Sequence, residues 1–127
     1  MIAVILASRR LDRLYTGLSL LVATAAEGEA ARGLATFEAL DPLLDPELLA
    51  RALRPEETPA LSEPGRGTFA RTLVELRETA AELPGCRIWA CAASVETTGL
   101  ELGGRLDGVL STSRFLREVA GARLVVV

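Results

Sequence analysis

The chain has 127 residues and a formal net charge of −3, half of its residues are hydrophobic, and it contains no His or Lys. A length of 127 residues predicts one domain, residues 1–127, with room for a sizeable core. An acidic balance without a basic run argues against nucleic acid or an anionic membrane as the partner. Ser-His-Asp and Cys-His catalysis, His metal sites and Lys Schiff bases are excluded within the chain.

Membrane insertion, export and a bound cofactor are also not predicted. No stretch approaches the roughly 20 uninterrupted apolar residues of a membrane helix. Arg9 and Arg10 follow the apolar opening rather than precede it, unlike in a signal peptide. The chain has no Walker loop and no G-x-G-x-x-G motif, and its two cysteines, spaced C-x4-C, form no zinc or thioredoxin motif. We expect a soluble cytoplasmic protein with no metal and no cofactor.

Strands and helices alternate along the whole predicted chain. A buried strand at residues 1–7 is followed by an amphipathic helix from Leu11, with Gly28 at its C′ position. The pattern then predicts a strand at 30–37, a short helix at 46–53, a helix at 69–83 capped by Thr68, strands at 86–91, 106–110 and 123–127, and helices after Ser94 and at 113–120. This order predicts a single-domain α/β fold: three layers (α/β/α) with a doubly wound, mostly parallel, five-stranded sheet and helices on both faces.

Residues 54–67 are rich in Pro, Gly and Glu, which predicts an exposed, mobile loop. A plain connector is one interpretation of this segment. A lid over a crevice at Cys91 is the other.

Cys91 is the side chain that we expect to carry chemistry. It ends the predicted strand at 86–91, and Ser94 is the predicted N-cap of a short helix that stops at Gly99. A helix start presents unpaired N–H groups that favour a thiolate, and α/β sheets bind ligands at the carboxyl ends of their strands. Cys86 opens the same strand roughly 16 Å away on the opposite face, too far for a disulfide. The alternative is that Cys91 is a small buried hydrophobe, as most free cysteines are.

Several segments carry a resemblance in their order and spacing. They are residues 8–28, Thr36-Phe37-Glu38 with Leu40, Ala90-Cys91-Ala92-Ala93-Ser94, Gly99-Leu100, Leu106-Asp107-Gly108-Val109 and Phe115-Leu116. Together they resemble the DsrE/DsrF-like (DsrE/DsrF/DsrH-like) sulfur-relay family over most of the chain. The chain departs from the family pattern in Ala39, where glycine is usual, in a shorter loop after Val109, and in having no Lys or His beside the cysteine.

The resemblance implies a small doubly wound subunit that forms homo-oligomers, often trimers or hexamers, and a cysteine that can carry persulfide sulfur. That role transfers to Cys91 and not to Cys86. Two hypotheses follow. In the first, the protein is a sulfurtransferase or sulfur carrier in which Cys91 accepts sulfur, Ser94 and the following N–H groups stabilise it, and a donor or acceptor protein is the partner. In the second, it is a non-catalytic oligomeric binding module with a structural Cys91.

Overall fold

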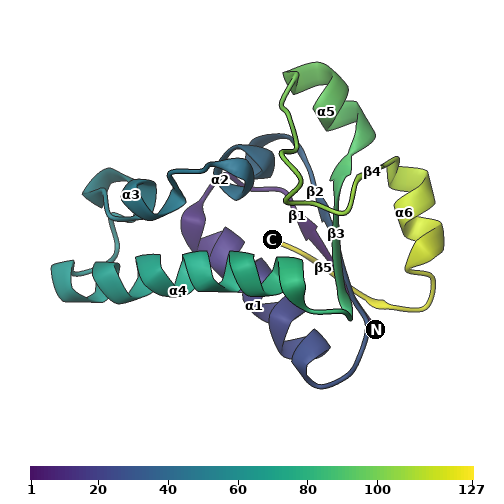
Figure 1. Ribbon diagram of the computed structural model, residues 1–127, viewed down its shortest axis with the longest axis horizontal. Helices are drawn as coiled ribbons and strands as arrows, with labels where there is room; N and C mark the ends of the chain where they lie inside the picture. Colours follow the sequence, from purple (N-terminus) through teal and green to yellow (C-terminus); the bar gives the residue numbers. More distant parts are fainter.

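Five parallel strands form one sheet, in the order β4-β3-β2-β1-β5, in the computed structural model, which describes residues 1–127 (Figure 1). The strands are β1 (Ile2–Leu6), β2 (Ala31–Ala35), β3 (Cys86–Cys91), β4 (Val109–Leu110) and β5 (Arg123–Val126). The predicted single-domain α/β fold with a parallel five-stranded sheet is therefore confirmed. All carboxyl ends of the strands lie at one edge of the sheet, as parallel pairing requires.

The helices are distributed unequally over the two faces of the sheet. They are α1 (Leu11–Ala26), α2 (Leu40–Leu44), α3 (Leu48–Ala52), α4 (Glu63–Glu82), α5 (Ala92–Thr98) and α6 (Thr112–Glu118), with 3-10 turns η1 (Phe37–Ala39) and η2 (Pro55–Glu57). The long helices α1 and α4 lie on one side of the sheet and the short α6 lies on the other, while α5 projects beyond the strand ends (Figure 1). None of these helices combines the length and the apolar character needed to cross a bilayer.

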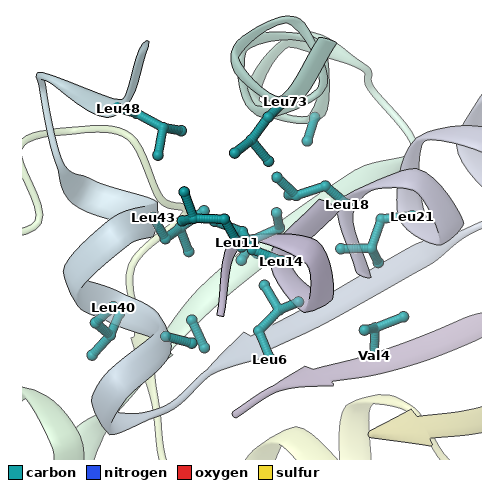
Figure 2. Close-up of a cluster of buried hydrophobic side chains, with 14 of the residues drawn as sticks. Val4, Leu6, Leu11, Leu14, Leu18, Leu21, Leu40, Leu43, Leu48 and Leu73 are labelled. Carbon is teal, nitrogen blue, oxygen red and sulfur yellow. The ribbon is translucent and has the colours of Figure 1, made fainter. Parts of the chain in front are cut away.

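The larger core lies between the sheet and α1 and α4. The predicted helical spacing of α1 is confirmed, since its buried leucines point together toward the sheet beside Leu73 of α4 (Figure 2). Tyr15 stacks on Phe69 with ring centroids 5.1 Å apart, which ties α1 to α4. The labelled members of this core are Val4, Leu6, Leu11, Leu14, Leu18, Leu21, Leu40, Leu43, Leu48 and Leu73.

A smaller core lies under α6 on the second face. Its buried members are Ala3, Leu34, Cys91, Phe115 and Val119. The ring of Trp89, on the same face of β3, meets Phe115 edge-on with centroids 6.2 Å apart. One seven-residue helix, α6, thus provides most of the cover on this face. Three of the four residues of the edge strand β5 are exposed.

The predicted start of α4 is wrong. Thr68 does not cap this helix; it begins at Glu63, and the Ser62 hydroxyl caps it by accepting a hydrogen bond from the Gly65 N–H at 3.3 Å. The loop predicted at 54–67 is therefore helical in its last third, and residues 55–57 form η2. Buried Arg66 holds the residues between η2 and α4 in place, because its guanidinium donates to the Thr58 hydroxyl and to the carbonyl groups of Thr58 and Leu61.

Other element boundaries are also shorter or shifted relative to the sequence pattern. The strand predicted at 30–37 ends at Ala35 and the helix predicted at 46–53 covers only Leu48–Ala52, preceded by the unpredicted α2. The strand predicted at 106–110 keeps only Val109 and Leu110, because Gly108 takes a positive φ of 125° that interrupts the strand. The helix predicted at 113–120 is α6, Thr112–Glu118, with Ser111 as its cap.

Candidate active site around Cys91

Cys91 is the last residue of β3 and lies beside Leu110 of β4 in the register of the sheet. Only 4% of its surface is exposed, and it packs in the smaller core under α6. The expected position at the carboxyl end of a strand is confirmed. Two helices begin within reach of it, because α5 follows Cys91 directly and α6 follows the neighbouring strand at Thr112.

The N-cap of α5 is Cys91 itself and not Ser94 as predicted. Cys91 has the extended backbone of a cap residue (φ −66°, ψ 127°), and the helix begins at Ala92, so Ser94 is its third residue. Local sequence favoured Ser94 because a serine hydroxyl is a strong capping group. In the structure, Cys91 takes the cap position because its pairing with β4 is the last of β3, and the chain turns into the helix directly after it.

Hydrogen bonds govern the protonation of the Cys91 thiol. Burial, the largest single effect, raises its pKa, but the Ser94 hydroxyl and the N–H groups of Ser94 and Ala93 act in the opposite direction and prevail, so that the pKa is lowered. The Thr112 hydroxyl, 3.9 Å from the sulfur, contributes in the same sense. Donors that point at a sulfur favour the thiolate over the thiol, which is the nucleophilic form. The principal effects that lower this pKa are thus hydrogen bonds rather than a neighbouring cation.

Ser94 connects Cys91 to the loop after β2. Its side chain is fully buried, and its hydroxyl accepts a hydrogen bond of 2.9 Å from the backbone N–H of Phe37. A hydroxyl that accepts one bond can donate its proton in another direction, here toward the sulfur. The structure therefore brings both predicted site residues, Cys91 and Ser94, together.

Sequence reasoning missed Phe37 and Thr112. Phe37 has a φ of 34°, a left-handed value that bulky residues rarely adopt, and the residue is 47% exposed. No sequence signal marks such a backbone. Thr112 could have been suspected, because Ser111 starts a helix just after a strand and the carboxyl ends of neighbouring parallel strands converge. No pattern in the sequence identifies β4 as the neighbour of β3.

Cys86 has a different environment on the other face of the sheet. It is 5% exposed and belongs to the larger core, so the two cysteines lie on opposite faces as predicted, and both are free. Burial and the nearby Asp107 carboxylate raise the pKa of Cys86 to about 11, against a smaller opposite effect of Arg32. The geometry favours a thiolate at Cys91 and a neutral thiol at Cys86.

The possible lid at residues 54–67 does not cover Cys91. Residues 56–61 line a depression with Arg9, Arg10 and Asp12 at the start of α1. Cys91 packs under α6 on the opposite face, and Figure 1 shows the α3–α4 connection and the β3–α5 junction at opposite ends of the molecule. The lid interpretation is therefore wrong, since this segment and the cysteine belong to different faces of the sheet.

No family model matches this chain, and no curated protein matches its sequence. No three His, Cys, Asp or Glu side chains lie together in a way that could hold a metal ion. The carboxylates of Asp41, Asp45 and Glu57 surround the guanidinium of Arg51.

Proposed function

We propose that the protein is a sulfur carrier or sulfurtransferase in which Cys91 accepts sulfane sulfur. The observation that carries this proposal is the set of donors around one sulfur atom: the Ser94 hydroxyl, two helix N–H groups and the Thr112 hydroxyl. The resemblance to the DsrE/DsrF-like sulfur-relay family supports the same assignment. Under it, a sulfur donor or acceptor protein is the partner, the protein acts in the cytoplasm, and the subunits assemble as trimers or hexamers.

The reaction is a pair of thiol exchanges without net oxidation. The Cys91 thiolate attacks the terminal sulfur of a donor persulfide, R–S–SH, so that a Cys91 Sγ–S bond forms as the donor S–S bond breaks. The donor leaves as a thiolate that takes the proton from the transferred sulfur and becomes R–SH, and the bound Cys91 persulfide anion faces the Ser94 and Thr112 donors. An acceptor thiolate then attacks the outer sulfur and releases the Cys91 thiolate. Ser94 and Thr112 orient the sulfur and stabilise negative charge on it.

A structural role of Cys91 in a non-catalytic oligomeric binding module is the second candidate. The observation that favours it is burial, because 4% exposure leaves little of the sulfur open to a donor and buried cysteines are mostly inert. In this alternative the hydrogen bonds of Cys91 only join β3 to α5 and α6.

Incubation of the folded protein with inorganic polysulfide followed by intact-mass and peptide mass spectrometry tests the proposal. We expect a mass increase of whole sulfur atoms on Cys91, reversed by a thiol reductant. Cys91→Ser should abolish this increase, and the matched variant Cys86→Ser should keep it. A Cys91 that stays unmodified while the protein is folded contradicts the carrier role and supports the structural one.

A further inference from the structure

The strand β5 leaves an open edge to the sheet. Strand order places β5 and β4 at the two edges, but β4 is only two residues long, which is a common way to protect an edge. β5 has four residues with no proline, and Arg123 is its only charge. Natural edge strands usually carry a blocking feature, so an unblocked one is a pairing site.

Backbone direction shows which groups of β5 are free. The N–H groups of Arg123 and Val127 donate to the carbonyl groups of Met1 and Ile5, at 3.2 and 2.9 Å. Because the backbone groups of a strand alternate between its two sides, Val125 also faces β1. Leu124 and Val126 therefore direct both N–H and C=O toward the open side, where no strand lies.

The same two residues also expose their side chains. Leu124 is 51% and Val126 is 62% exposed. In the register with β1 they lie beside Ala3 and Ile5, on the sheet face that α6 covers only in part. Free backbone groups and exposed apolar side chains thus coincide on two residues two positions apart, which is the pattern a paired strand requires.

We propose that β5 pairs antiparallel with β5 of a second copy of this chain, around a two-fold axis at Val125, to form one continuous sheet across two subunits. Leu124 of each copy then faces Val126 of the other, and these facing pairs exchange four backbone hydrogen bonds. Each copy covers the exposed apolar side chains of the other. A two-fold contact of this kind builds a dimer or joins two trimers into a hexamer, and it does not depend on the role of Cys91.

The charge of Arg123 favours antiparallel over parallel pairing of the two strands. A parallel pairing would place Arg123 beside Arg123 of the second copy, and like charges directly opposite each other destabilise a sheet. Around an axis at Val125 the two arginines lie four residue steps apart along the strands, roughly 13 Å at 3.3 Å per residue. This separation exceeds the screening length of about 8 Å at physiological ionic strength. The strand is therefore compatible with its own antiparallel copy, and no acidic partner strand is needed.

Light scattering after size exclusion, with the full chain and the variant Val126→Pro, tests the pairing. The Val126 N–H faces the open side, so proline removes only an intermolecular donor and spares the bonds to β1. We expect the wild type to contain an even number of 13.5 kDa subunits and Val126→Pro to have half that mass with an unchanged circular dichroism spectrum. Val126→Thr, which keeps the N–H group and the branched shape, should keep the wild-type mass.

Amide exchange measured residue by residue gives a second reading. The Leu124 and Val126 amides should be protected in the wild type. In Val126→Pro, where residue 126 has no N–H group, the Leu124 amide should exchange fast, while the Val125 amide stays protected in both proteins. A wild type that is monomeric, or has an odd number of subunits, overturns the proposal and leaves the edge to a strand of another protein. An unchanged mass in Val126→Pro overturns it as well. Loss of assembly in Val126→Thr would instead assign the contact to side chains and contradict strand pairing. Cys91→Ser should assemble like the wild type, which separates this test from that of the carrier role.

Discussion

The backbone N–H of Phe37 donates a 2.9 Å hydrogen bond to the Ser94 hydroxyl, so the loop after β2 holds a side chain that also lowers the pKa of the Cys91 thiol. Phe37 reaches this position with a left-handed backbone that costs on the order of 1–3 kcal/mol. Strain of this kind persists where surrounding contacts demand it. The bond to Ser94 is such a contact, and it gives the candidate site a rigid support from a second strand.

Ser94→Ala should make Cys91 less reactive. The variant removes a donor that favours the thiolate, so the pKa of Cys91 rises and iodoacetamide labelling at neutral pH slows. Hydrogen bonds to charged groups contribute about 1.5–3 kcal/mol, and roughly half of this is offset because a less acidic thiolate is the stronger nucleophile, so we expect labelling to slow by about three- to tenfold. It also leaves the Phe37 N–H without its acceptor, which should cost about 1–3 kcal/mol of stability. The measurement is the pH dependence of the labelling rate.

Thr97→Ala is the matched control for Ser94→Ala. The exposed Thr97 hydroxyl bonds only the Ala93 carbonyl within α5, so its loss should leave the labelling profile in place. An unchanged profile in Ser94→Ala would show that this hydroxyl does not govern the thiol.

Stability should fall in alkali because of Cys86. Its folded-state pKa is raised from 9.0 to about 11, so between these values the unfolded state loses a proton that the folded state keeps, and unfolding becomes easier as pH rises. The loss should be on the order of 2 kcal/mol. Urea unfolding at a series of pH values, followed by the fluorescence of Trp89, measures it. Cys86→Ala should be less stable at pH 8 but should lack this decline, and an equally steep decline in the variant would contradict the assignment.

The elements that the sequence predicted well depend on long, regular patterns. Leu11, Leu14, Leu18 and Leu21 recur at helical spacing, and each is buried against the sheet. The apolar run from Cys86 to Cys91 is β3 without any change of boundary. Such patterns survive because burial of a whole face outweighs any single local preference.

Where the sequence misled, long-range contacts overrode local preference. The start of α4 contains Pro64, Gly65 and Gly67, which argued for a loop, yet the Ser62 cap and buried Arg66 hold it helical. At the candidate site the cysteine was predicted, but its role as the cap and its contact with Thr112 depend on the pairing of β3 with β4. Pairing between distant strands leaves no trace in the spacing of either one.

Arg51→Met should destabilise the protein by about 2–4 kcal/mol, toward the lower side of the range for broken buried ion pairs because the partners are partly exposed. The Arg51 side chain is 5% exposed, and its guanidinium lies 3.2–3.4 Å from carboxylate oxygens of Asp41, Asp45 and Glu57. Without it, three carboxylates repel one another between α2 and η2. Urea unfolding gives the loss, and the exposed Arg13→Met is the control. Equal stability of the two variants would show that the cluster contributes nothing.

Alanine substitution of two helical glycines should change the stability of the protein in opposite directions. In α1, a methyl group at Gly17 would overlap the buried Leu6 side chain and lie 2.9 Å from Val127 Cγ2, so Gly17→Ala forces β1 and α1 apart. Overpacking of this kind costs about 1–3 kcal/mol, more than the gain in helix propensity. In α4, a methyl group at Gly67 meets only the flexible end of Arg71 at 3.4 Å. Gly67→Ala should therefore stabilise by about 0.5–1 kcal/mol, the ordinary advantage of alanine over glycine in a helix. Urea unfolding of both variants measures the difference, and a stabilising Gly17→Ala would contradict the close contact of α1 with the sheet.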